Sequence, residues 1–165
     1  VQVIPGKEYG VMHRQNRSEN EVVVVVKPWS DEKKPVLKEQ YRKAIEDYIE
    51  PYRLINTKVT VESARYAGIC VHGKIALEQD SPKTRKAVLE RISRELSYTE
   101  RKHPFGTVIS YGQLFTALEN TEGVKKVLEL NLERTGNAAR KNDRGDVLLD
   151  ADALGILEET DLEFC

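Results

Sequence analysis

The sequence has few of the residues from which most catalytic and metal sites are built: three histidines and two cysteines among 165 residues. No apolar run approaches the roughly 18–20 residues that a membrane-spanning helix needs. The longest, residues 22–26, suits a buried strand. The formal net charge of −1 leaves no overall basic field to attract nucleic acid or an anionic membrane. We therefore expect neither as a partner.

The scarcity of histidine and cysteine limits metal chemistry. His13, His72 and His103 are far apart, so no pair has the spacing of metal ligands. Cys70 and His72 form the only Cys-x-His, which offers two ligands where four are needed. The acidic residues at 150 and 152 lack the downstream glycine and glutamate of a calcium loop. We expect no metal-binding and no cofactor-binding residue.

Signatures of catalysis are also missing. The glycines form neither a phosphate-binding loop nor a dinucleotide fingerprint, and no G-x-S-x-G occurs. The cysteines, Cys70 and Cys165, form no C-x-x-C; two free thiols in a reducing compartment are favoured over one disulfide. Carboxylates are frequent, but no pair stands out. We expect no catalytic residue, no enzyme activity and no small-molecule substrate.

The apolar pattern begins at the first residue. Residues 1–4 resemble a strand, and residues 5–20 form a polar, exposed connection. The β-branched run at 21–27 does not alternate, which is typical of a central strand buried on both faces. Because the chain starts inside a strand-like segment without an initiator Met, we expect a fragment of a longer protein.

Two longer helices follow. The first, residues 36–52, carries an apolar stripe at three- and four-residue spacing: Leu37, Tyr41, Ala44, Ile45, Tyr48, Ile49 and Tyr52. Tyrosines at helical spacing are typical of a core with wet hydroxyls, and a nucleobase platform is the less favoured alternative. Ser81 and Pro82 open the second helix, which runs to about Tyr98. Its Lys- and Arg-rich face indicates a solvated surface rather than a nucleic-acid surface.

Strands and a third helix complete the pattern. Residues 58–62 alternate, and so do residues 65–78, where five side chains face the core: Ala67, Ile69, Val71, Ile75 and Leu77. Gly73 indicates a bulge in this strand. Ser110 caps a short helix with an apolar stripe of Tyr111, Leu114, Phe115 and Leu118. A last long strand places Val124, Leu128, Leu130 and Leu132 on one face.

This order predicts an α+β fold, namely a ferredoxin-like βαββαβ sheet with helices on one face, over residues 21–133. Residues 1–20 would be an N-terminal strand and exposed linker. Residues 134–165 would form a loop and a small C-terminal β extension. The polar segment 134–145 has two glycines and no evident apolar anchor, so we expect it to be mobile.

The succession of motifs resembles the carboxy-terminal part of the baseplate J-like protein family of contractile phage tails and contractile injection systems. The resemblance spans residues 21–165. The first motifs are the valine-rich strand ending at Pro28, the helix 37–52, the N-T-K-V-T-V segment 56–61, in which Asn56 stands where glycine is common, and the start of the long strand at 64–69. The most specific motif is Phe105-Gly106 together with Tyr111, Leu114, Leu118, Glu122-Gly123-Val124 and Val127. The last is the closing segment 146–155.

The resemblance implies a structural component of a phage, prophage or tail-like particle that acts through protein–protein interfaces in baseplate assembly. Its partners would be other baseplate or tail proteins and possibly itself, with assembly in the cytoplasm. The family motifs name no catalytic residue, so none is carried over. The alternative is a free-standing ferredoxin-like ligand-binding or regulatory domain. An RNA-binding sheet is disfavoured because the strands lack the aromatic pattern it needs.

The absence of clustered ligands leads to a first prediction. Protein purified without added metal should contain no stoichiometric metal by elemental analysis, because two ligands on one strand bind a transition metal weakly. A transition metal near one equivalent would contradict this expectation and direct attention to Cys70 and His72.

Overall fold

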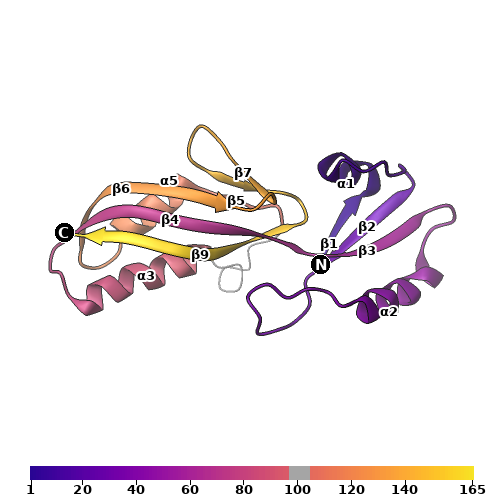
Figure 1. The fold of residues 1–165 in the computed structure, drawn as a ribbon, viewed down its shortest axis with the longest axis horizontal. Coiled ribbons are helices and arrows are strands. Elements are labelled where there is room, and N and C mark those ends of the chain that lie inside the picture. Colours follow the sequence, from indigo (N-terminus) through magenta and orange to yellow (C-terminus); the bar gives the residue numbers. More distant parts are fainter. Residues whose placement is uncertain (97–104) are drawn as a thin grey trace. The chain divides into compact units, whose positions relative to one another are not determined.

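The computed structural model describes residues 1–96 and 105–165, and its chain forms two compact units, Val1–Arg65 and Tyr66–Cys165 (Figure 1). His103 and Tyr98 fall outside the described residues. The two units do not coincide with the expected ranges 1–20, 21–133 and 134–165.

The N-terminal unit is a three-stranded sheet with two helices. Its strands are β1 (Gln2–Pro5), β2 (Glu21–Val26) and β3 (Lys58–Ser63), in the order β1-β2-β3. Strand β1 is antiparallel to β2, whereas β3 is parallel to it. Helix α1 (Gly6–His13) joins β1 to β2; helix α2 (Glu39–Ile49), extended by the short helix η1 (Glu50–Tyr52), joins β2 to β3. Strand β2 is central, as predicted, with one face fully buried and the other half-buried.

Helix α1 occupies part of the stretch that the sequence predicted to be an exposed connection, so that prediction is wrong for residues 6–13. Two glycines allow the helix to pack closely. A Cβ at Gly6 would lie 2.6 Å from the Cβ of Glu21, and one at Gly10 would lie 2.6 Å from the Gln15 carbonyl oxygen. These glycines are needed for close backbone approach.

Arg17 ties the connection after α1 to the sheet. Its Nη1 donates to Glu21 Oε1 at 2.6 Å and to Thr60 Oγ1 at 3.2 Å, and its Nη2 donates to Glu62 Oε1 at 3.1 Å. The guanidinium also lies 4.9 Å from the centroid of the Tyr9 ring. Burial would raise the pKa of Glu21, but the Thr60 hydroxyl and Arg17 outweigh it, so the pKa is lowered.

The C-terminal unit contains two three-stranded sheets. The larger has the order β6-β4-β9, with β4 (Arg65–Leu77), β6 (Val124–Thr135) and β9 (Ala153–Phe164). Strand β6 is antiparallel to β4. Cys165 donates its N–H to Ile75 O at 3.1 Å, and Leu77 donates its N–H to Cys165 O at 2.8 Å, the pattern of parallel neighbours. The smaller sheet has the order β5-β8-β7, with β5 (Val108–Ile109), β7 (Ala139–Lys141) and β8 (Val147–Leu149).

Helices α3 (Pro82–Leu96) and α5 (Tyr111–Glu119) cover one face of the larger sheet. Val88 and Ile92 of α3 and Leu114 of α5 share one core with the inward side chains of β4. Both predicted N-caps are confirmed. Ser81 Oγ accepts the Thr84 N–H at 3.2 Å, and Ser110 Oγ accepts the Gln113 N–H at 3.4 Å.

Strand β6 contains two irregularities that change which side chains face the core. Lys74 is opposite Glu129, but the next residue, Ile75, is opposite Val127, so Leu128 is skipped. Val127 is therefore buried and Leu128 is 47% exposed. The prediction that Leu128 shares the core face is wrong. The irregularity lies one residue beyond Gly73, whose added Cβ would come within 2.5 Å of the Glu129 carbonyl oxygen.

Segment 134–145 is more anchored than its composition indicated. Ala138 and Ala139 are buried in the core, which corrects the expectation that the segment has no apolar anchor. Asp146, just beyond it, accepts the Tyr111 N–H at 2.9 Å and the Asn142 Nδ2–H at 3.1 Å. These bonds lower the pKa of Asp146 and join the turn to the first residue of α5.

The α+β class is confirmed, but the ferredoxin-like topology is not. Strands β3 and β4 are almost continuous in sequence, yet β3 pairs with β2 and β4 pairs with β6. Ala64 continues the first sheet by donating its N–H to Val26 O at 3.0 Å. Pairing of this kind depends on contacts distant in sequence, which strand patterns do not specify.

The Arg17 contacts give a stability prediction. Arg17→Met should lower the free energy of unfolding of the N-terminal unit by about 2–3 kcal/mol, because the buried Glu21 carboxylate loses its nearest charged donor and keeps only the longer charged contact to Lys58, at 3.5 Å. The matched control Lys7→Met breaks an exposed pair with Glu19 and should cost less than about 1 kcal/mol. Urea unfolding followed by circular dichroism measures both variants.

The same contacts predict an acid dependence. Because folding lowers the pKa of Glu21 below its ordinary value of 4.5, its stabilising effect is present above that value. It is lost as the pH falls through the lowered folded value. Arg17→Met should reduce this loss; an unchanged acid-unfolding curve would contradict the role of Arg17.

Candidate interaction surfaces

Cys70 and His72, the two potential ligands noted in the sequence, lie on the face of β4 opposite the helices. Cys70 is buried, and burial together with the neighbouring carboxylates of Glu159, Glu158 and Glu133 raises the pKa of its thiol. His72 Nδ1 lies 3.9 Å from Asp161 Oδ2. Both Cys70 and Cys165 are free thiols. Among residues 1–96 and 105–165, no group of three or more His, Cys, Asp or Glu side chains is arranged to hold a metal ion.

The structure has several open surface hollows. One lies between α3 and α5 and is lined by residues that include Arg91, Glu95, Gln113 and Asn120. Small-molecule sites are typically enclosed and lined mainly by apolar side chains, which this hollow is not. No helix in the part of the chain that the structure describes combines the length and apolar character needed to cross a membrane.

The first candidate interaction surface is the α2 surface, which we define as Tyr41, Tyr48, Tyr52, Leu54 and Ile55. Their exposed fractions are 56%, 72%, 75%, 77% and 90%. The sequence predicted that the tyrosines belong to a core stripe, and this is wrong. No α2 residue is buried; of the predicted stripe, only Leu37, which precedes α2, and the isoleucines at 45 and 49 are half-buried.

The exposure of the tyrosines follows from the small sheet beside them. Helix α2 packs beside β3, an edge strand, where Glu46 Oε1 accepts the Val61 N–H at 3.0 Å. That arrangement covers one side of the apolar stripe and leaves the tyrosine side in solvent. The rings of Tyr48 and Tyr52 lie 5.8 Å apart, so they form a continuous aromatic surface.

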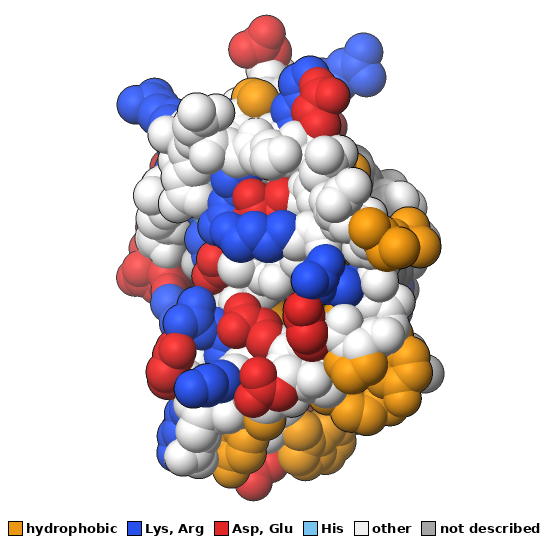
Figure 2. All heavy atoms as spheres, turned by 90° about the vertical axis from the view of Figure 1, so that its right-hand side faces the viewer, with side chains coloured by type: hydrophobic (Ala, Val, Ile, Leu, Met, Phe, Trp, Pro, Cys, Tyr) orange, Lys and Arg blue, Asp and Glu red, His pale blue; other side chains and the backbone are white. Residues whose placement is uncertain are grey.

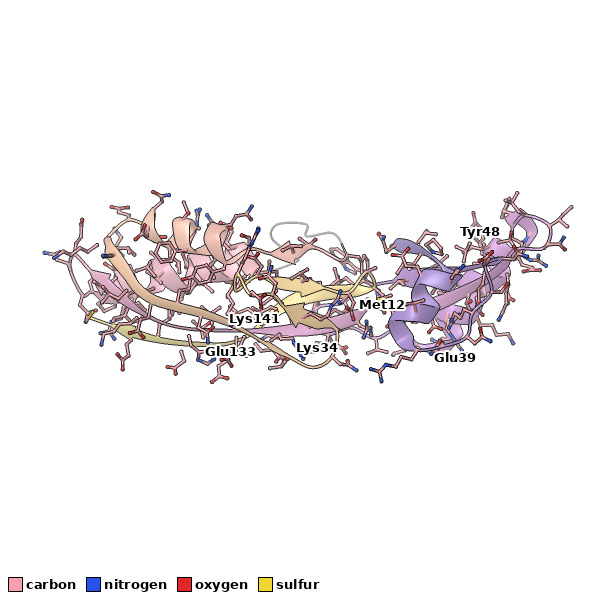
Figure 3. The ribbon with its side chains drawn as sticks, turned by 90° about the horizontal axis from the view of Figure 1, so that it is seen from above. Met12, Lys34, Glu39, Tyr48, Glu133 and Lys141 are labelled. Carbon is pink, nitrogen blue, oxygen red and sulfur yellow. The ribbon has the colours of Figure 1, made fainter. Side chains whose placement is uncertain are left out.

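The α2 surface is large for a solvated one. At about 150–250 Å² for a whole aromatic side chain, its three tyrosines expose on the order of 400 Å², to which Leu54 and Ile55 add. The largest apolar patch of a typical monomer is about 300–600 Å². Figure 2 faces the end of the N-terminal unit that carries α2 and shows hydrophobic side chains gathered on part of it; Tyr48 is labelled in Figure 3. A surface of this size and composition is typical of a protein interface.

The second is the acidic sheet surface, on the face of β6-β4-β9 away from the helices. Strand pairing places Glu133 opposite Cys70 and Glu129 opposite Lys74. Lys74 Nζ lies 2.9 Å from Glu163 Oε2. We define the surface by its six exposed carboxylates: Glu129, Glu133, Glu158, Glu159, Asp161 and Glu163. Lys74 and Lys126 lie on the same face, and Lys141 donates to Asn131 beside it. Glu133 and Lys141 are labelled in Figure 3.

The acidic sheet surface was missed in the sequence, although a signal was present. Acidic residues recur at every second position in Glu159, Asp161 and Glu163, and Glu129 and Glu133 are four residues apart, an even spacing. Each pattern puts the carboxylates on one strand face. Only the adjacency of β6 and β9 to β4 brings the two patterns together.

The third is the basic α3 surface, which we define as Lys83, Lys86 and Arg94. All three are exposed on the side of α3 away from its core residues. Two other cations of this helix are engaged within the unit. Arg85 makes two contacts with Asp80, the shorter at 2.5 Å, and Arg91 Nη2 lies 3.3 Å from Glu95 Oε1. The prediction of a charged outer face for this helix is confirmed.

No protein-family model and no curated protein matches this sequence. In structure, the chain is similar to one in a complex described as "Cryo-EM structure of the anti-feeding prophage (AFP) baseplate, 6-fold symmetrised". The TM-score is 0.63 at 15% sequence identity, over 86% of this chain and 29% of that chain. The likeness is therefore one of fold, and this chain spans less than a third of the chain that it matches.

The α2 surface gives a prediction that separates surface from core. Tyr48→Ser with Ile55→Ser should change the free energy of unfolding by no more than about 0.5 kcal/mol per site, because both side chains are already in solvent. Ile69→Ala, in the core of β4, should cost about 2–5 kcal/mol. Urea unfolding compares the variants. If the double variant lost more than about 2 kcal/mol of unfolding free energy, the two side chains would have to be buried in the core, and the assignment of a solvent-exposed α2 surface would be wrong.

Proposed function

We propose that this protein is a structural, non-catalytic component of a contractile-tail baseplate, in a phage, prophage or tail-like particle. It would act through protein–protein interfaces in baseplate assembly. The observation that carries the proposal is the likeness in fold to a baseplate chain over 86% of this chain. Fold alone does not imply function, so the exposed surfaces provide the second line of support.

The α2 surface is suited to such a role. Tyrosine is enriched in protein interfaces and in the residues that contribute most to binding, and here three tyrosines are joined by two aliphatic residues. A large assembly repeats each contact in many copies, so a surface of modest affinity suffices once neighbours are held together. We infer that this surface contacts another baseplate or tail protein.

At the finer level, we propose membership in the baseplate J-like family, in its carboxy-terminal part. The glycines of the most specific motif support this, because both need a conformation that favours glycine. Gly106 has φ +67° and Gly123 has φ +84°, and a Cβ at Gly123 would lie 2.7 Å from Thr84 Cγ2. The backbone conformation of this fold therefore favours glycine at both motif positions.

The remaining parts of the proposal concern location and partners. The protein would be assembled in the cytoplasm and end in the particle, in contact with other baseplate proteins and possibly with its own copies. Nucleic acid, membrane and small-molecule substrate are not among the proposed partners. A ferredoxin-like regulatory domain ranks lower, because the hollow between α3 and α5 is open and mostly polar.

The proposal predicts a specific assembly defect. In a genome that encodes the particle, Tyr48→Lys with Ile55→Lys should lower the yield of complete sheathed particles by at least about 10-fold, as expected when two interface anchors are lost. Unassembled tube and sheath proteins should accumulate. Electron microscopy of purified particles counts the complete ones.

The control is Val1→Lys with Val11→Lys, which changes two exposed valines elsewhere in the N-terminal unit. It should leave particle yield unchanged. Because the α2 substitutions are in solvent, both variant proteins should remain folded by circular dichroism. Normal yield from a folded α2 variant would exclude this surface from assembly, and normal yield after deletion of the whole segment would refute the baseplate function.

A further inference from the structure

We propose that copies of this chain associate head to tail through the C-terminal unit, with the acidic sheet surface of one copy against the basic α3 surface of the next. The proposal rests on charge and geometry within that unit and does not depend on the baseplate function. It commits to one occupant for the open sheet face, namely α3 of a second copy.

The two surfaces lie on opposite sides of the same two-layer unit. Val88 and Ile92 of α3 pack into the core with Ile69 of β4, so α3 covers one face of the sheet. Lys83 and Lys86 are exposed on the outer side of the helix. The carboxylates lie beyond the other face of the sheet, beside the even-numbered residues of β4. A copy displaced along the sheet normal therefore brings opposite charges together.

The charge on each surface is unbalanced within its own unit. On the acidic sheet surface, Glu163 is engaged with Lys74, and Glu158 accepts a hydrogen bond from the Thr135 hydroxyl. Four further exposed carboxylates lie there, namely Glu129, Glu133, Glu159 and Asp161. Among the described residues, the other lysines noted on this surface are Lys126 and Lys141. On α3, the three cations of the surface face one exposed carboxylate, Glu90. Lys86 Nζ is 3.5 Å from Glu90 Oε1, an exposed i,i+4 pair of little strength. Each surface thus has charge available for a partner of opposite sign.

The arrangement excludes a symmetric face-to-face dimer through either surface. Two acidic sheet surfaces in contact would oppose carboxylate to carboxylate, and two α3 surfaces would oppose cation to cation. Only the contact between unlike surfaces is favourable, and this makes the interface heterologous. A heterologous interface closes into a ring or continues as a filament, depending on the rotation between copies.

Sedimentation velocity of the purified chain tests the proposal. At an ionic strength of about 0.01 M, where charges act over roughly 30 Å, the weight-average mass should rise above 18.8 kDa as protein concentration increases. At about 1 M, where the range is roughly 3 Å, it should return to the monomer value. Association that persists or strengthens at high salt would overturn the proposal and indicate the apolar α2 surface.

Charge reversal identifies the two surfaces. Glu159→Lys with Asp161→Lys should abolish low-salt association, and so should Lys83→Glu with Lys86→Glu. The chain that carries all four reversals should associate again, because the interface is restored with opposite sign. The matched control Glu8→Lys with Asp47→Lys makes the same charge change as the first pair, on exposed positions of the N-terminal unit, and should associate like the parent.

Each outcome decides the question. Thermal unfolding confirms that the variants are folded, which the exposure of the substituted side chains favours. Low-salt association lost in both reversed variants and regained in the combined one supports the head-to-tail contact. A parent chain that remains monomeric at low salt overturns it. So does a combined variant that stays monomeric, or a control that dissociates. Particle assembly is not measured, so this test can fail without bearing on the baseplate proposal.

Discussion

The one-sided burial of strand β4 is the constraint on which the C-terminal unit depends. Its odd-numbered residues from Ala67 to Leu77 are buried, apart from half-buried Gly73, and they share a core with both helices. Neighbours pair with it on both edges. Because side chains alternate along a strand, the even-numbered positions must then face the other way. The alternation of side chains along β4 therefore determines both which face of the sheet forms the core and which face carries the acidic sheet surface.

The N-terminal unit meets a different limit, which is the size of its sheet. Three strands, one of only four residues, cannot cover the full apolar stripe of α2. A small domain buries a smaller share of its surface than a large one. The unit compensates with polar contacts, since Arg17 connects the residues after α1 to both β2 and β3. This ion network thus supplements a small apolar core that includes Val23, Val25 and Val61.

Much of the local structure was predictable because its causes are local. The caps at Ser81 and Ser110, the alternation of residues 65–78 and the central position of β2 all follow from neighbouring residues. The division of the strands among three sheets was not predictable in the same way, since strand pairing joins residues distant in sequence. The position of Leu128 was missed because a bulge shifts every side chain beyond it, and alternation alone cannot show where a bulge occurs.

The exposed tyrosines of α2 show what a periodic sequence pattern does not determine. Periodicity identifies which side chains share a helix face, but it does not say what covers that face. In α3 the apolar face meets the sheet of its own chain, and in α2 most of it does not. The apolar α2 surface and the charged surfaces of the other unit also differ in physics: salt weakens contact between charges and leaves apolar contact intact. Ionic strength therefore distinguishes which of the two units holds copies or partners together, and it does so without any substitution.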